Sequence, residues 1–233
     1  MHGKRVMLVE DDPEIARFII LSLSQYGIIV THEENGITAA RRILEEKPDA
    51  VLLDGFLPGM NGIDVCRKVR TAYRGPIIML TSMSEDSDQI MALEFGADDY
   101  IIKPADPRVI LAHLKACLRR APVTGDASTP EMLSFGDLTI CLTTRLVTLN
   151  EAPVPMTDSE FDLLWLLASN AGRILSRDEI YEQTRGLDYD GLDRSIDMRI
   201  SRLRKHLHDD SEHPNRIKTV RAKGYLFSPT ERK

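Results

Sequence analysis

The sequence predicts an α/β domain built on a parallel five-stranded sheet, followed by a smaller α+β domain. Three observations predict this division. Short apolar runs alternate with helical patterns through the first half, a Pro- and Gly-containing segment without periodicity follows, and β-patterned runs with capped helices come after it. We therefore expect a first domain at 1–120, a linker at 121–131 and a second domain at 132–233.

Composition is that of an ordinary globular protein. Of the 233 residues 42% are hydrophobic and 28% charged, and the formal net charge of −6 gives no overall sign of a nucleic-acid partner. The three cysteines, Cys66, Cys117 and Cys141, show no CxxC spacing, which favours reduced thiols. No apolar run approaches the ~20 residues that cross a bilayer, so we expect a cytoplasmic protein without membrane contact.

The strands of the first domain are predicted from five apolar runs. Between them lie amphipathic stretches such as Ile15/Phe18/Ile19 and Ile110/Leu114, which have helical spacing. Alternation of this kind is typical of parallel strands with right-handed helical crossovers. The runs are 6–9, 28–30, 50–53, 77–80 and 100–102.

Polar residues follow these strands at their carboxyl ends, where open α/β sheets place their ligands. Carboxylates gathered at one rim repel one another unless a divalent cation lies among them, and Mg²⁺ suits oxygen ligands of this kind. The residues are Glu10, Asp11 and Asp12 after the first strand, Asp54 after the third, Thr81 after the fourth and Lys103 after the fifth.

This combination predicts that Asp54 accepts a phosphoryl group. Mg²⁺ would neutralise charge on the group, Lys103 would pair with its oxygens, and Thr81 would donate its hydroxyl to the phosphate. Each residue alone has a simpler interpretation as a capping, turn or solvated residue. Asp12, which precedes Pro13 at a helix start, is assigned mainly to capping.

Four segments resemble the receiver domain of response regulators, whose fold is flavodoxin-like. They are 8–12 (LVEDD), 54–62 (DGFLPGMNG), 79–81 (MLT) and 96–104 (GADDYIIKP). The resemblance implies that Asp54 is the phosphoacceptor, that Asp11, Asp54 and the backbone carbonyl of Phe56 bind Mg²⁺, and that Glu10 assists through water. It also implies that Thr81 and Tyr100 form a switch pair and that the Lys103–Pro104 bond is cis.

The same resemblance implies a homodimer formed on phosphorylation. Asp99 and Arg120 match one intersubunit ion pair of close relatives. Gln89, Val109 and His113 replace other residues of that dimer face, and Ala105 stands where phenylalanine is common. We expect the dimer to form through altered contacts.

The second domain begins with short β-patterned runs and continues with two capping boxes, Thr157 to Glu160 and Ser176 to Glu179. A helix follows at 193–207, and a hairpin with a basic tip at 216–227. Between Arg194 and Lys223 there are nine Lys/Arg against four acids. Positive charge concentrated on one helix and one hairpin predicts a DNA-facing surface, although a basic solvated helix face is a simpler reading of the helix alone.

This half resembles the winged helix-turn-helix domain of the OmpR/PhoB family, and of RstA-type regulators in particular. The resemblance makes Arg199 and Arg202 candidates for base edges, Met198 for a thymine methyl and Arg221 for the minor groove. It places the loop at 186–192 against RNA polymerase. The full set of expected DNA-binding residues is Arg194, Ser195, Met198, Arg199, Ser201, Arg202, Arg204, Lys205, Lys218, Thr219, Arg221, Lys223 and Tyr225.

The predicted function is therefore a response regulator that a sensor histidine kinase phosphorylates on Asp54, and that then dimerises and binds double-stranded promoter DNA; no enzyme is expected. One alternative is a phosphorylation-independent DNA binder with a degenerate receiver, which the intact set of rim residues argues against. The other is an aspartyl-phosphate phosphatase of the haloacid dehalogenase type, which needs a second aspartate where this chain has Phe56.

Overall fold

The computed structural model describes residues 2–81, 95–118, 132–185 and 195–229, and the chain divides into two compact units, Met1–Leu118 and Arg119–Lys233. The predicted boundaries at 120 and 131 fall outside the described residues. Among the described residues, no helix has both the length and the apolarity to cross a bilayer.

The first unit contains the parallel five-stranded sheet that the sequence predicts, in the order β2-β1-β3-β4-β5. All pairings between neighbouring strands are parallel. Its elements are β1 Arg5–Val9, α1 Pro13–Ser24, β2 Ile29–Glu33, α2 Gly36–Glu46, β3 Ala50–Asp54, α3 Gly62–Val69, β4 Ile77–Thr81, β5 Asp99–Ile102 and α5 Pro107–Leu118.

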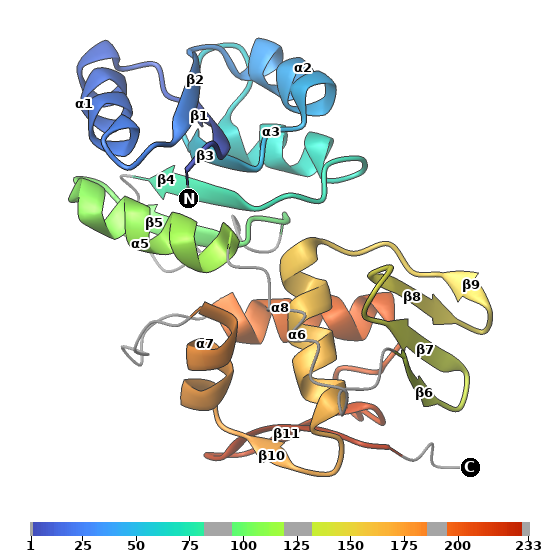
Figure 1. The fold of residues 1–233 in the computed structure, drawn as a ribbon. Helices are drawn as coiled ribbons and strands as arrows, with labels where there is room; N and C mark the ends of the chain where they lie inside the picture. The colour runs from blue at the N-terminus through green and yellow to red at the C-terminus, as the bar shows by residue number, and fades with distance from the viewer. Residues whose placement is uncertain (1, 82–94, 119–131, 186–194, 230–233) are drawn as a thin grey trace. The chain divides into compact units, whose positions relative to one another are not determined.

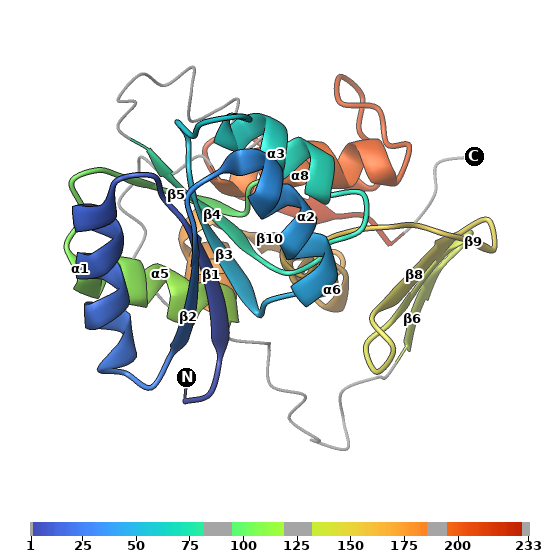
Figure 2. The same ribbon diagram turned by 90° about the horizontal axis from the view of Figure 1, so that it is seen from above.

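Helices cover both faces of this sheet, with α1 and α5 on one side and α2 and α3 on the other (Figure 2). The alternation of side chains along β1 shows why: Val6 and Leu8 pack into the core that α1 and α5 share, while Met7 and Val9 are fully buried on the opposite face. Strands buried on both faces read as continuous apolar runs, which is how β3 and β4 were predicted.

The edge strand β2 differs most from its prediction. The apolar run at 28–30 marks only its beginning, and the strand continues through the polar residues Thr31, His32 and Glu33. The backbone of these residues pairs with β1 in regular register, so the strand extends beyond the apolar run.

The described residues of the second unit form a four-stranded antiparallel sheet, three helices and a three-stranded sheet whose order is β10-β12-β11 (Figure 1). Helix α6 begins at a complete capping box. The Glu160 amide donates to the Thr157 hydroxyl, and the Thr157 amide donates to the Glu160 carboxylate. The elements are β6 Met132–Phe135, β7 Leu138–Cys141, β8 Leu146–Leu149, β9 Ala152–Pro153, α6 Asp158–Ser169, β10 Ile174–Leu175, α7 Arg177–Arg185, α8 Ser195–His206, β11 Ile217–Val220 and β12 Gly224–Phe227.

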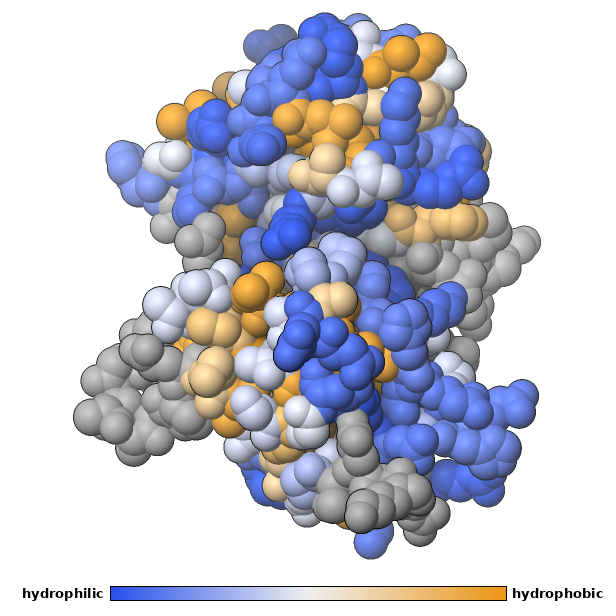
Figure 3. All heavy atoms as spheres, turned by 90° about the vertical axis from the view of Figure 1, so that its right-hand side faces the viewer, coloured by the Kyte–Doolittle hydropathy of each residue, from blue (hydrophilic) through white to orange (hydrophobic). Residues whose placement is uncertain are grey.

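One apolar core joins the parts of the second unit. Helix α8 places Ile196, Ile200, Leu203 and Leu207 into it, as the helical spacing predicts, together with residues of α6, both sheets and α7. The face of the molecule seen in Figure 3 is mostly hydrophilic, with apolar residues interspersed in both units.

Candidate functional site

Three carboxylates meet at the carboxyl edge of the parallel sheet. Glu10 and Asp11 follow β1, Asp54 ends β3, and these two strands are hydrogen-bonded neighbours with Val9 opposite Leu53. One oxygen from each of the three carboxylates lies within 4.8 Å of the others. Glu10 and Asp54 are buried, at 1% and 6% exposure, and Asp11 is exposed. The structure therefore brings together the acidic cluster that the sequence predicted.

Lys103 forms ion pairs with two of these carboxylates. Its Nζ lies 2.6 Å from Glu10 Oε2 and 2.8 Å from Asp54 Oδ2. Burial lowers the pKa of the Lys103 ammonium, but the hydrogen bonds and charges of Asp54 and Glu10 outweigh burial and raise it. The lysine is therefore held in its charged form beside the phosphoacceptor candidate.

The acidic cluster still carries unbalanced negative charge. Burial raises the pKa of the Glu10 carboxyl, and the negative charge of Asp54 adds to this rise although Lys103 opposes it. Burial and the charge of Asp54 both disfavour the ionised form of Glu10, so a further positive charge beside these carboxylates would stabilise it. Carboxylate oxygens at this separation are the donors that a hard divalent cation prefers, so the residues present fit Mg²⁺.

The turn after Asp54 is tightly packed. The amide of Gly55 donates to the carbonyl of Leu80 (3.1 Å), and the amide of Gly62 donates to the carbonyl of Gly55 (2.9 Å). A Cβ at position 62 would lie 1.9 Å from the carbonyl oxygen of Asp54, so only glycine fits. The amide of Phe56 donates to Asp54 Oδ1 at 3.3 Å. These contacts set the direction of the Asp54 side chain.

The remaining predicted receiver residues lie at the ends of β4 and on β5. Thr81 is buried beside Gly55, where a Cβ would sit 3.7 Å from the threonine hydroxyl. Tyr100 is half-buried and pairs in register with Met79. The Lys103–Pro104 bond is cis, as the resemblance implied.

Asp12 serves the helix, as its sequence context predicted. Its carboxylate accepts hydrogen bonds from the amides of Glu14 (2.8 Å) and Ile15 (3.1 Å) at the start of α1.

Asp99, expected on the dimer face, makes a contact inside its own unit. Its side chain is 1% exposed, and its Oδ2 lies 2.7 Å from His113 Nδ1 on α5. Its expected partner Arg120, as well as Gln89, lies outside the described residues.

The predicted DNA-facing residues of the second unit differ in exposure. Lys205 on α8 and Thr219, Arg221 and Lys223 on the hairpin are exposed, and Met198, Ser201 and Lys218 are half-buried. Arg194 and the loop at 186–192 lie outside the described residues. Ser195 is the first residue of α8.

Three of the arginines of α8 that the sequence predicts to contact DNA are buried in the structure. Arg199 is 3% exposed, and Arg202 and Arg204 are 9% exposed. The Nε of Arg202 lies 3.2 Å from Oε1 of Glu160 on α6. The contacts with DNA that the sequence predicts for these residues stay predictions.

Arg204 joins the helix to the wing. Its guanidinium donates to the carbonyl of Ile217 at 2.6 and 3.0 Å and to the hydroxyl of Thr219 at 2.8 Å. This fixes the hairpin against the C-terminal half of α8. The structure thus gives Arg204 a role within the domain, and its predicted contact with DNA stays a prediction.

Tyr225 is also buried, at 3% exposure, and its assignment to the DNA surface stays a prediction. Its hydroxyl donates to Asp197 Oδ1 at 2.6 Å, and Arg177 donates to both groups at 2.9 and 3.2 Å. Burial and the Asp197 contact raise the pKa of the Tyr225 phenol. The three residues connect β12, α8 and α7.

The sequence did not reveal the second role of Glu160. Burial opposes ionisation of its carboxyl, but the His206 hydrogen bond, the Arg202 charge and the Thr157 amide lower its pKa to about 2. The capping-box motif identified Glu160 as a helix cap, yet nothing in that motif indicates partners some forty residues later. Glu160 therefore holds α8 against the start of α6.

Comparison with known proteins finds a matching family model for each of the two units. A family model described as the response regulator receiver domain matches residues 6–115, and one described as transcriptional regulatory protein, C terminal, matches residues 151–227. The chain thus belongs to the response regulators of the OmpR/PhoB type, which join a receiver domain to a DNA-binding domain.

Individual relatives match along almost the whole length. The transcriptional regulatory protein RstA of Escherichia coli K12 is 47% identical over 232 residues, covering 96% of this chain and 97% of the relative. A solved structure of a RitR mutant superposes with a TM-score of 0.76 at 25% identity, covering 97% and 99% of the two chains. The response regulator DrrB of Thermotoga maritima gives a TM-score of 0.51 at 31% identity, covering 98% and 100%.

Proposed function

We propose that this response regulator is phosphorylated on Asp54 by a sensor histidine kinase, with Mg²⁺ bound by Asp11, Asp54 and the carbonyl of Phe56 and with Glu10 assisting through water. The observation that carries the proposal is the contact of Lys103 with both Glu10 and Asp54 at the sheet edge. The positive charge of the Lys103 ammonium already lies between the carboxylates of Asp54 and Glu10. The site is therefore arranged to hold negative charge.

The chemistry is the transfer of a phosphoryl group from a donor to the Asp54 carboxylate. A carboxylate oxygen of Asp54 attacks the phosphorus of the donor, the bond from phosphorus to the donor nitrogen or oxygen breaks, and the leaving group keeps the electron pair. Bound Mg²⁺ would neutralise charge on the phosphoryl oxygens during transfer. Lys103 pairs with one of these oxygens. Thr81 donates its hydroxyl to the phosphate on Asp54, and the side chain of Tyr100 moves into the space beside Thr81.

The proposed output is control of transcription through promoter DNA. The exposed residues Lys205, Arg221 and Lys223 are the first candidates for phosphate and minor-groove contacts. Met198, Ser201, Lys218 and Thr219 lie partly or fully at the surface. The other candidates for DNA contacts are Arg194, Ser195, Arg199, Arg202, Arg204 and Tyr225. Binding to promoters implies a cytoplasmic protein.

We further propose that phosphorylation favours a homodimer through the face that contains Asp99 and Arg120, and that the loop at 186–192 contacts RNA polymerase. Phosphorylation shifts this equilibrium only by its differential interaction with the two receiver states. We propose a regulator and not a phosphatase, because Phe56 stands where a second catalytic aspartate would be needed.

The test is intact-mass measurement after incubation with acetyl phosphate and Mg²⁺. Wild type should gain one phosphoryl group, Asp54→Asn should gain none, and the matched control Asp12→Asn should gain it as wild type does. DNA binding is then measured with the treated chains on fragments that phosphorylated wild type selects from genomic DNA. Equal modification of Asp54→Asn, or equally tight DNA binding by it, would overturn the proposal.

A further inference from the structure

Both backbone polar groups of Glu10 are held by two consecutive residues of the edge strand β2. The amide of Glu10 donates to the carbonyl of Glu33 at 3.0 Å, which continues the sheet by one residue. The carbonyl of Glu10 lies 2.8 Å from Nε2 of His32. Because a carbonyl oxygen only accepts hydrogen bonds, this nitrogen carries the ring proton and donates it.

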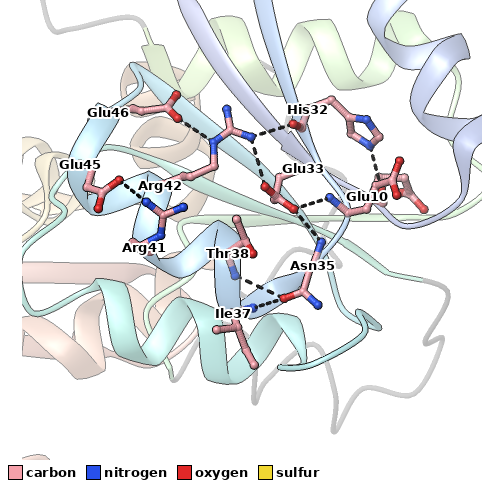
Figure 4. A network of polar contacts seen from close by, with 11 residues as sticks. Glu10, His32, Glu33, Asn35, Ile37, Thr38, Arg41, Arg42, Glu45 and Glu46 are labelled. Carbon is pink, nitrogen blue, oxygen red and sulfur yellow. Dashed lines mark hydrogen bonds and ion pairs between the residues drawn. The ribbon is translucent and has the colours of Figure 1, made fainter.

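The imidazole takes the place that a backbone amide has elsewhere in a sheet. The amides of Glu34 and Asn35, which follow β2, both donate to the carboxylate of Glu33, at 3.0 and 3.1 Å. Strand β2 therefore ends at Glu33, and the two amides that follow it bond to the Glu33 side chain. The His32 side chain supplies the donor for the carbonyl at that position (Figure 4).

His32 and Glu33 are themselves anchored to α2. Arg42 donates to the carbonyl of His32 at 2.9 Å and to Glu33 Oε2 at 3.2 Å, and its Nε donates to Glu46 at 2.7 Å (Figure 4). Burial opposes the ionisation of Glu33, but the Asn35 amide and Arg42 outweigh it and lower the pKa of that carboxyl. The contact to Glu10 is thus backed by a charged network and not by a mobile side chain alone.

The same segment also touches the second loop of the acidic cluster. The amide of Gly36 donates to the carbonyl of Pro58 at 3.0 Å, and a Cβ at position 36 would lie 1.9 Å from the carbonyl oxygen of Met60. Residues 32–36 therefore support both the loop that carries Glu10 and Asp11 and the loop that follows Asp54.

We propose that His32 is a positioning residue for the divalent-cation site, because its ring fixes the carbonyl of Glu10 and through it the carboxylates of Glu10 and Asp11. This inference rests on the proposed magnesium site at that edge. Groups that orient metal ligands from outside the coordination shell contribute about tenfold or more to affinity. The residue touches no reacting atom, so its effect should appear in metal binding and not in the transfer step.

The experiment titrates Mg²⁺ into the full chain by isothermal calorimetry. His32→Val and His32→Phe remove the donor, the second at similar ring volume, and we expect both to weaken the Mg²⁺ Kd by about tenfold. His32→Gln places an amide donor near the same position and should restore binding to within about threefold. Arg41→Ala is the matched control, since its partner Glu45 and Arg41 itself are exposed on α2, and it should bind as wild type.

A second readout separates positioning from a general loss of structure. Phosphorylation by acetyl phosphate is followed at increasing Mg²⁺, and the donor-free variants should need more metal yet reach the wild-type rate at saturation. A wild-type Kd in folded His32→Phe overturns the inference, as does equal weakening in His32→Gln. Should wild type itself show no Mg²⁺ binding, the proposed magnesium site fails first, which is a distinct outcome.

Discussion

The ion pair between α6 and α8 offers a sharp test of how the DNA-binding unit is held together. In Glu160→Gln the amide oxygen can still accept the Thr157 amide, so the capping box survives. The negative charge facing Arg202 and His206 is lost. Any destabilisation therefore reports on the contact between the two helices and not on the helix cap.

The magnitude follows from the pKa of Glu160, which falls from 4.5 to about 2 in the folded protein. At about 1.4 kcal/mol per pKa unit, this difference corresponds to about 3 kcal/mol of folding stability. The Glu160 side chain is only 2% exposed, so solvent screening does not reduce the value much. We expect Glu160→Gln to lose about this amount at pH 7.

The sign of the pH dependence is defined by the lowered pKa. Because Glu160 is more acidic in the folded state, its contribution is fully present above about pH 4.5 and is lost as the pH falls toward 2. Wild type and Glu160→Gln should therefore differ most at neutral pH and converge in acid.

Urea unfolding followed by tryptophan fluorescence measures this difference in the full chain, because Trp165 on α6 is the chain's one tryptophan and is buried in the same unit. Glu179→Gln is the matched control: Glu179 occupies the same position of the second capping box, but its side chain is 37% exposed. It should unfold close to wild type. Equal stability of Glu160→Gln and wild type at pH 7, or a difference that persists unchanged into acid, would refute the reasoning.

Three further changes test other contacts. Lys205→Ala should weaken cognate and random DNA alike and reduce the slope of log affinity against log salt by about one, as filter binding at several salt concentrations would show; a loss confined to cognate DNA would contradict a phosphate contact. Tyr225→Phe removes the hydroxyl that lies 2.6 Å from Asp197 and should cost about 1 kcal/mol in tryptophan-monitored unfolding, whereas unchanged stability would leave that hydrogen bond without effect. Gly62→Ala forces a Cβ against the Asp54 carbonyl and should destabilise the first unit by about 2 kcal/mol in calorimetry; an unshifted transition would show that the turn relaxes freely.

Much of the first unit was predictable because its signals are local. Buried parallel strands read as apolar runs, and the residues after them must meet at one edge once the strands are parallel. Glu10, Asp11, Asp54 and Lys103 were therefore brought together from sequence order alone, and the structure places them within contact distance. The cap at Asp12 was equally local.

The DNA-binding unit was predictable in its elements but not in the use of each cation. The sequence identifies Arg202, Arg204 and Tyr225 as basic or polar groups on the helix and hairpin, and it treats them as surface residues. The structure pairs the first two with Glu160 and with the carbonyl of Ile217. Which face of a charged helix is buried depends on what packs against it.

The sequence by itself determined the order of the elements, the helix caps and the residue types at the sheet edge, because periodicity and spacing carry that information along the chain. Only the tertiary structure decided which of those polar groups meet: His32 with the Glu10 carbonyl, Asp99 with His113, and Glu160 with Arg202. These pairs join residues of different helices and strands, and burial removes competing water from each contact. No local pattern encodes such a partner.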